Sequence, residues 1–206
     1  LGMLTAGQTT PTSYFVDAAE REKKGGQAFY SCLEYNSEIY FGSDNGRVWC
    51  YQKENGQFQL QNLPASSRIV SINSVEGNEL IFTTAKDGFF SYQPKTKAIE
   101  HFPASRFPNA SIHSVYVDKA SEVWFEQHIP GTVVHFNPRT RILKQEKVPV
   151  EPTSTDRSRP AFHIHEDING VLWVHPYGGG FSYFDRKSNS LHPFYNSLSG
   201  SDWRFS

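Results

Sequence analysis

The sequence has 206 residues, and its 20 Lys and Arg nearly balance its 21 Asp and Glu, which gives a net charge of −1 at pH 7. This length fits one ordinary domain, and an apolar fraction of 37% is enough for a core. The near-neutral balance argues against nucleic-acid binding, and no apolar run reaches the length of a membrane-spanning helix. An aromatic fraction of 15% favours strands and turns over helices.

The first 27 residues do not match the remainder of the chain, and we interpret them as a remnant of a preceding repeat unit or as a linker. Within them, residues 17–24 (DAAEREKK) fit a short helix with Asp17 as its N-cap, and fit a solvated loop equally well.

A repeat begins at about residue 28. Four segments align, namely EIYFGSDNGRVWCY, ELIFTTAKDGFFSY, EVWFEQHIPGTVVHF and VLWVHPYGGGFSYFD. The second residue of each segment recurs at intervals of 41, 43 and 49 residues, at Ile39, Leu80, Val123 and Leu172. A glycine before the last strand recurs at intervals of 42, 43 and 49 residues, at Gly46, Gly88, Gly131 and Gly180. Because two independent landmarks keep the same step, the period reflects a structural repeat.

Each unit has the pattern of four short strands separated by turns. Four strands in roughly 40–45 residues is typical of a β-propeller blade, in which both faces of each sheet are buried. The sequence therefore predicts an all-β fold, a β-propeller with blades at about residues 28–62, 68–103, 111–147 and 161–195, as a segment of a larger ring. A generic β-sandwich explains the short strands but not the period.

The last residues, 196–206, end in DWRFS and fit the start of a further, truncated blade. An open arc of blades exposes two apolar faces, so we expect neighbouring modules or a second copy of the chain, as a homodimer, to cover them.

The fourth unit carries a resemblance to a known family. Residues 167–185, which read D-x-N-G-x-L-W-V-x-x-Y-G-G-G-F-S-Y-F-D, are similar to the two-component-regulator propeller repeat. The resemblance extends over all four units, but the third departs from the pattern because Glu126, Gln127 and His128 replace its Gly-Thr turn.

This repeat occurs in the periplasmic sensor regions of Bacteroides-type hybrid two-component systems. The resemblance therefore implies a seven-bladed ring, neighbouring propeller and β-sandwich modules, and a parent protein with a histidine kinase. It also implies a periplasmic location and, as ligands, breakdown products of polysaccharides.

Two cysteines are too few for a disulfide framework. Cys32 falls on the first strand of its blade and Cys50 on the third, so their Cα atoms are expected about 10 Å apart, beyond the reach of a disulfide. The sequence predicts two free, mostly buried thiols.

No motif indicates a catalytic, metal or cofactor site. His163, His165 and Asp167 alternate along one strand and so point the same way. A zinc site would also need a third His or Cys at matching depth, and none is evident, so we predict no metal. The chain has no nucleophile elbow and no P-loop. A propeller lyase or glycan hydrolase, and a protein-interaction scaffold, remain alternatives.

Ligand contacts are expected on the loops at one end of the blades. In a propeller, the turns between second and third strands share one end with the connections between blades. The candidate ligand-binding residues there combine Arg, Lys and aromatic side chains suited to sugars, and they are Asp44, Arg68, Lys86, Arg106, His128, Arg159 and Tyr177. The function predicted from the sequence is a non-catalytic segment of a sensor that responds to oligosaccharides, without a cofactor.

Overall fold

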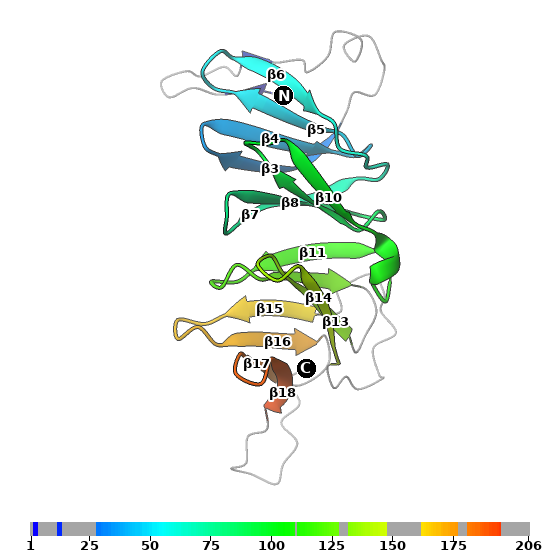
Figure 1. Cartoon of the computed structure of the whole chain (residues 1–206), viewed down its shortest axis with the longest axis vertical. Helices are drawn as coiled ribbons and strands as arrows, with labels where there is room; N and C mark the ends of the chain where they lie inside the picture. Colours follow the sequence, from blue (N-terminus) through cyan, green and yellow to red (C-terminus); the bar gives the residue numbers. More distant parts are fainter. Residues whose placement is uncertain are drawn as a thin grey trace.

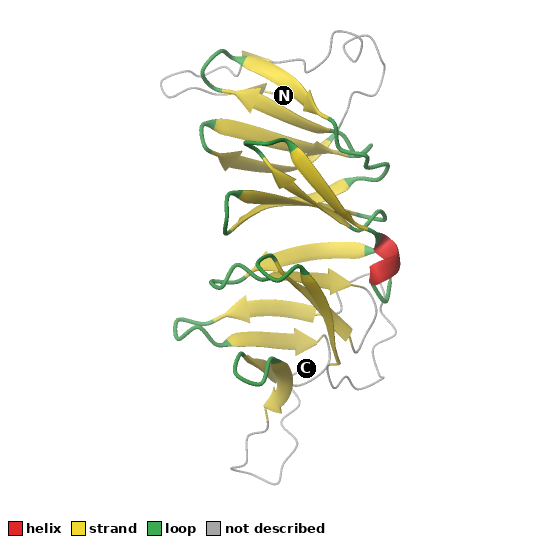
Figure 2. Ribbon diagram, viewed as in Figure 1, coloured by secondary structure: helices red, strands yellow, loops and turns green. Residues whose placement is uncertain are grey.

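A computed structural model shows four antiparallel sheets stacked along the long axis of the molecule (Figure 1). The structure describes residues 2–3, 12–13, 28–109, 111–127, 132–147, 162–176 and 181–194. Helix within these residues is limited to one short 3-10 turn, η1 (Ala104–Arg106), which is coloured red in Figure 2. No helix in the described part has the length and hydropathy needed to cross a bilayer.

The sheets follow one another along the chain, and each contains four strands in sequence order. Sheet I consists of β3 (Phe29–Tyr35), β4 (Glu38–Ser43), β5 (Val48–Gln52) and β6 (Gln57–Gln61). Sheet II consists of β7 (Ile69–Val75), β8 (Glu79–Thr84), β9 (Phe89–Gln93) and β10 (Ala98–Phe102). Sheet III consists of β11 (Ile112–Val117), β12 (Val123–Gln127), β13 (Thr132–Asn137) and β14 (Ile142–Lys147). Sheet IV consists of β15 (Phe162–Glu166), β16 (Leu172–Pro176), β17 (Phe181–Asp185) and β18 (Ser190–Phe194). Two-residue strands β1 (Gly2–Met3) and β2 (Thr12–Ser13) pair separately.

Three apolar cores fill the spaces between successive sheets. Tyr40, Phe82 and Phe90 belong to the core between sheets I and II. Phe89, Phe125 and Phe136 pack together between sheets II and III, and Trp124 and Phe184 meet between sheets III and IV. Strand alternation explains this, because neighbouring residues such as Phe89 and Phe90 point to opposite faces and so serve different cores. Burial of each such side chain contributes about 1.5–3 kcal/mol.

The contacts between sheets follow chain order. β3 packs against β7, β7 against β11, and β12 against β15. Figure 1 shows sheets I and IV at opposite ends of the stack, so the four sheets form an open arc and not a closed ring of four. The all-β propeller fold is therefore confirmed as a segment, whereas a total of seven blades stays a prediction.

The cysteine prediction is correct about bonding and about the burial of Cys50, and wrong about the burial of Cys32. Both thiols are free, but Cys32 is exposed while Cys50 is fully buried. In the strand register, Cys50 lies opposite Tyr40, on the face that packs against sheet II, whereas Cys32 lies opposite Phe41, on the other face. A strand near the edge of the arc has one covered face and one open face, which the repeat alone did not distinguish.

Candidate functional site

At the predicted ligand-binding end, the described loops around sheet II are joined to one another. The turn after β8 is joined by hydrogen bonds to the connections on both sides of sheet II. Ala85 N donates to Arg68 O at 2.9 Å, Lys86 N donates to Ser67 Oγ at 3.0 Å, and Ile112 N donates to Ala85 O at 3.4 Å. The turns between second and third strands therefore share one end with the connections between sheets, as expected.

The recurring glycines allow this close crossing of loops. Gly46 and Gly88 have φ values of +82° and +86°, in the left-handed region that side chains disfavour. A Cβ atom on Gly46 would lie 2.5 Å from the carbonyl oxygen of Ala65, and one on Gly88 would collide with the carbonyl oxygen of Phe102. At Gly46 and Gly88, the landmark of the repeat is thus a place where one backbone passes directly over another.

Asp87 fixes the connection between sheets I and II, and the sequence analysis did not single it out. Its carboxylate accepts hydrogen bonds from the backbone N–H and the hydroxyl of both Ser66 and Ser67, at 2.8–2.9 Å. Burial alone would raise the pKa of Asp87, but these four donors hold it below its usual value. The sequence feature that could have indicated this contact is an acidic residue directly before the recurring Gly88, together with the Ser66-Ser67 pair in the preceding connection.

Four of the seven predicted ligand residues lie in the described part, and all four are exposed at the loop end: Asp44, Arg68, Lys86 and Arg106. The Arg68 guanidinium lies 5.1 Å from the ring centre of Tyr30, and the Arg106 guanidinium lies 5.4 Å from that of Phe102. Phe102 is buried, but Tyr30 is exposed, and an exposed cation beside an exposed aromatic ring suits acidic or ring-shaped polar ligands. The remaining three, His128, Arg159 and Tyr177, lie outside the described residues, as does the helix considered at 17–24.

Charged side chains bridge adjacent sheets at the opposite end, where the third and fourth strands turn. Arg141, at φ +59° in the turn after β13, binds Glu79 at 2.7 Å and Glu100 at 2.5 Å, both on sheet II. Its guanidinium also lies 5.3 Å from the ring centre of Phe102 and 5.1 Å from that of Phe136. Desolvation opposes the charge, but the two carboxylates raise the pKa of Arg141 above its usual value. Arg141 therefore fastens sheet III to sheet II.

A related arrangement occurs one sheet later, with one carboxylate beside the preceding sheet and one on the same sheet as the arginine. Arg186, in the turn after β17, lies 3.1 Å from Asp118 Oδ2 and 3.4 Å from Glu166 Oε1. The side chains of Asp118 and Glu166 are buried, with exposures of 0% and 3%. The sequence showed basic residues in these turns but did not indicate that they reach the preceding sheet.

Between sheets III and IV lies a buried imidazole. His135 stacks on Trp124 with ring centres 4.3 Å apart and 9° between planes. Its Nδ1 is 3.4 Å from Glu122 Oε2, and its Nε2 is 3.7 Å from Glu146 Oε1. Burial alone would raise the pKa of Glu122, but His135, Asn137 and Arg186 hold it below its usual value. This cluster lies at the centre of an interface and is inaccessible to a large ligand.

Metal chemistry has no support among the described residues, where no group of three or more His, Cys, Asp or Glu is arranged to hold an ion. His163 and His165 are exposed on β15, and Asp167 instead accepts hydrogen bonds from Asn169 N, Val171 N and Trp173 Nε1. Asp167 is therefore a turn carboxylate.

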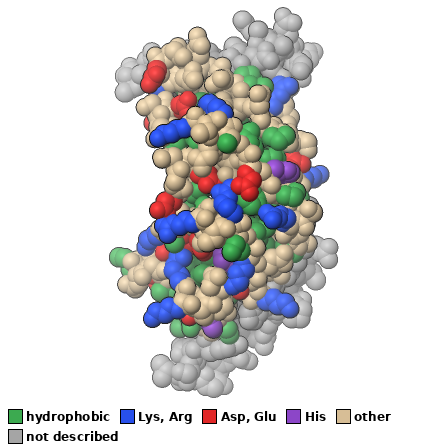
Figure 3. All heavy atoms as spheres, in the orientation of Figure 1, with side chains coloured by type: hydrophobic (Ala, Val, Ile, Leu, Met, Phe, Trp, Pro, Cys, Tyr) green, Lys and Arg blue, Asp and Glu red, His purple; other side chains and the backbone are tan. Residues whose placement is uncertain are grey.

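Figure 3 shows basic and acidic side chains interspersed over the visible face, without one dominant charged patch.

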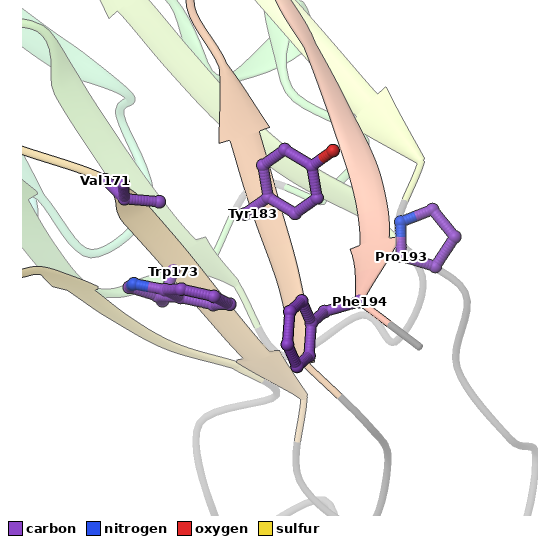
Figure 4. Close-up of a pocket in the computed structure, with 5 residues that line it drawn as sticks. All are labelled: Val171, Trp173, Tyr183, Pro193 and Phe194. Atoms are coloured by element: carbon purple, nitrogen blue, oxygen red, sulfur yellow. The ribbon is translucent and has the colours of Figure 1, made fainter. Parts of the chain in front are cut away.

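An open hollow of about 530 Å³ lies on sheet IV, and none of the four ligand candidates in the described part of the chain lines it. Val171, Trp173, Tyr183, Pro193 and Phe194 line the hollow, and Figure 4 shows the three aromatic rings of Trp173, Tyr183 and Phe194 standing around it. The hollow is thus largely apolar and belongs to a sheet face, not to the loop end.

Comparison with known proteins gives the fold a context. No protein-family model matches the sequence, and no curated protein matches it. Among solved structures, the extracellular domain of the hybrid two-component system BT3049 from B. thetaiotaomicron is similar with a TM-score of 0.62 and 14% identity, over 89% of this chain and 26% of that domain. The extracellular domain of the hybrid system BT4673 from the same organism gives 0.57 and 19%, over 83% of this chain and 23% of that one.

A third similar structure is catalytically inactive virginiamycin B lyase from Staphylococcus aureus with quinupristin, at a TM-score of 0.62 and 11% identity, over 84% of this chain and 57% of the lyase. At these identities the likeness is one of fold. The chain is a β-propeller segment that spans about a quarter of the two extracellular domains. The resemblance seen in the repeat to Bacteroides two-component sensor regions is confirmed at this level.

Proposed function

We propose that this chain is a non-catalytic segment of a ligand-sensing region, located outside the cytoplasm in a membrane-anchored two-component regulator. The observation that carries the proposal is the shared fold over 89% of the chain with the extracellular domain of a hybrid two-component system. The repeat pattern of residues 167–185 supports it independently, because it is a property of the amino-acid sequence alone.

The proposed ligand is an oligosaccharide, and the proposed contact surface is the loop end. Arg68 supplies a cation beside the aromatic ring of Tyr30. Lys86 supplies a second cation on the neighbouring loop. Sugars bind through apolar ring faces and through hydroxyl or carboxylate oxygens, which this combination accommodates. Signalling would then proceed by a shift in packing between modules and not by bond chemistry.

The experiment is calorimetry of the whole extracytoplasmic region against a panel of neutral and acidic oligosaccharides. We expect one class to bind, and we expect Arg68→Ala and Lys86→Ala to weaken its affinity at least about tenfold. The matched control is Lys95→Ala, which removes an exposed cation from the turn between β9 and β10 at the opposite end of the sheets and is expected to leave affinity unchanged. Equal affinity in all three variants would reject the loop end as the binding surface.

A lyase is the second candidate function, because the fold is equally similar to virginiamycin B lyase, with a TM-score of 0.62. Incubation of the protein with quinupristin, followed by chromatography, separates the two. The sensor proposal expects unchanged quinupristin, and a product peak that grows with protein concentration would favour the lyase.

A further inference from the structure

The described loops at the ligand-binding end carry an excess of positive charge. These loops are residues 44–47, 62–68, 85–88 and 103–109. Their charged side chains are four cations and two carboxylates, namely Arg47, Arg68, Lys86, Arg106, Asp44 and Asp87. The whole chain, by contrast, has a net charge of −1. The positive excess is therefore a local property of this end, and a local excess of one sign attracts ligands of the opposite sign.

One of the two carboxylates is engaged by the chain's own backbone. The oxygens of Asp87 accept the backbone N–H and the hydroxyl of both serines in the connection 62–68, at 2.8–2.9 Å. Asp87 forms no ion pair with the cations around it. Within the described residues, no carboxylate pairs with Arg68, Lys86 or Arg106, and we call these three the loop cations.

Arginines at the opposite end of the sheets behave differently. Arg139 pairs with Glu76, and Arg141 pairs with two carboxylates of sheet II. Arg186 lies 3.1 Å from Asp118 Oδ2. Each arginine that joins parts of the fold at that end thus has a carboxylate within the chain. Because the loop cations have none, their charge is available to a ligand.

Three crossing loops bring the loop cations to one region around sheet II. The carbonyl oxygen of Arg68 accepts a hydrogen bond at 2.9 Å from the backbone N–H of the residue before Lys86. A Cβ atom on Gly88, two residues after Lys86, would lie 2.8 Å from the backbone nitrogen of Ala104. Ala104 begins the turn η1, which ends at Arg106. The three side chains are all exposed, so a ligand can reach each of them.

Tyr30 adds an apolar surface beside this charge. Its ring is 56% exposed, and the Arg68 guanidinium lies 5.1 Å from the ring centre. The face of a sugar ring packs on an exposed aromatic ring. The planar fork of an arginine matches the two oxygens of a carboxylate, and a lysine supplies a point charge to the same group. A sugar ring that carries a carboxylate therefore satisfies both features at once.

We propose that the loop end selects acidic oligosaccharides built from uronic acids, whose rings pack on Tyr30 and whose carboxylates bind the loop cations. Such a ligand repeats its carboxylate from ring to ring, which suits cations on three successive loops better than a single anion does. Asp44, exposed on the neighbouring turn of sheet I, repels the same ligand and lowers its affinity. This inference rests on the proposed function, because it names the class of oligosaccharide that the same surface binds.

The test is calorimetry of the whole extracytoplasmic region with charged sugars and their neutral counterparts. The panel contains oligogalacturonides and alginate oligosaccharides, each with its methyl ester, and carrageenan oligosaccharides that carry sulfate but no carboxylate. We expect at least one acid to bind at least about tenfold more tightly than its ester at low salt. This difference should shrink in roughly 0.3 M NaCl, because salt screens exposed charges.

Three substitutions at exposed positions test the assignment to these side chains, with the ratio of acid affinity to ester affinity as the readout. Arg68→Gln should lower this ratio about tenfold. Asp44→Asn should raise it about twofold or more, because a repelling charge is removed. Lys95→Gln, which removes an exposed cation from the turn between β9 and β10, is the matched control and should leave the ratio unchanged.

Equal affinity for an acid and its ester, or binding of neutral sugars alone, would overturn the inference and leave the proposed function standing. Binding of the carrageenan sugars without any uronic acid would also overturn it, because the ligand would then be recognised by its sulfate groups. An Arg68→Gln variant that keeps the full ratio would show that the loop cations do not bind the carboxylates. If no sugar of any class binds, the proposed function fails, and the inference fails with it.

Discussion

At the scale of single residues, one sheet separates two thiols into different environments. Cys50 lies in the core between sheets I and II, with no exposed surface. Burial raises the pKa of Cys50 to about 12. Cys32, on the other face of sheet I, is exposed to solvent.

We therefore expect one fast and one slow thiol. At pH 8 Cys50 is almost entirely in the unreactive thiol form and has no exposed surface, so its reaction with a disulfide reagent requires unfolding. In the native protein, Ellman's reagent should titrate one thiol rapidly, and Cys32→Ser should remove that fast phase. Two fast thiols in the native protein would show that the sheet I–sheet II core is not closed as described.

The buried Glu122–His135 pair predicts a pH dependence of stability. The pKa of Glu122 is lowered in the folded state. A carboxyl group with a lowered folded pKa stabilises the protein above its unfolded pKa, and this contribution is lost as the pH falls through the folded value. We expect stability to decrease below about pH 4.5, where the unfolded carboxyl begins to take up protons.

Urea unfolding between pH 3 and pH 7 measures this effect. Glu122→Gln should make the profile shallower by on the order of 1 kcal/mol over that range. Glu54→Gln, at an exposed turn position, should leave its slope unchanged. A profile that keeps its full slope in Glu122→Gln would mean that other carboxylates carry the pH dependence.

At the scale of the elements, the glycines in the turns allow the loops of adjacent sheets to cross at close range, which stabilises the packing of one sheet on the next. Gly88→Ala introduces both an unfavourable positive φ and a collision with the backbone of Phe102, so we expect a loss of about 3 kcal/mol or more. Gly77→Ala is the matched control, because Gly77 has φ +84° but no atom within 4 Å of the added Cβ. It should cost only about 1 kcal/mol in chemical denaturation. Equal losses would show that the crossing loops can move apart.

The ion pairs of Arg141 and Arg139 are expected to contribute different amounts to the free energy of unfolding. Arg141→Met leaves the buried Glu79 carboxylate without its cation and should destabilise by about 2 kcal/mol. Arg139→Met, two residues earlier, breaks a surface pair with Glu76 whose side chains are 69% and 53% exposed, and should change stability by about 0.5 kcal/mol or less. If both substitutions have the same effect in urea unfolding, the charge does not fasten the sheets.

The sequence predicts the elements well because each sheet repeats the same local pattern. The period of Ile39, Leu80, Val123 and Leu172 identified four sheets, and Gly46 and Gly88 identified the crossing turns. The ion pairs could not be predicted, because they join residues up to 68 positions apart on different sheets. The sequence also does not show which face of an outer sheet is covered, because alternation separates the two faces of a strand without showing what packs on each. For this reason the sequence predicts a buried Cys32, whereas the thiol is exposed.

At the scale of the whole molecule, the open arc determines how function is tested. Sheets I and IV lie at opposite ends of the stack (Figure 1). The candidate ligand contacts follow one edge of that stack from Asp44 through Lys86 to Arg106, and do not converge on a single described pocket. Contacts along a line of loops suit an extended ligand that touches more than one sheet. The affinity for such a ligand would change when the packing between the sheets shifts.

The most direct measurement is hydrogen–deuterium exchange of the whole protein with and without an oligosaccharide selected by calorimetry from the panel of neutral and acidic sugars. We expect slower exchange at residues 62–68, 85–88 and 103–109, and unchanged exchange in the central strands of each sheet. A ligand that binds while every described residue of this chain keeps its exchange rate would contradict it, because the sensing surface would then lie in another part of the protein.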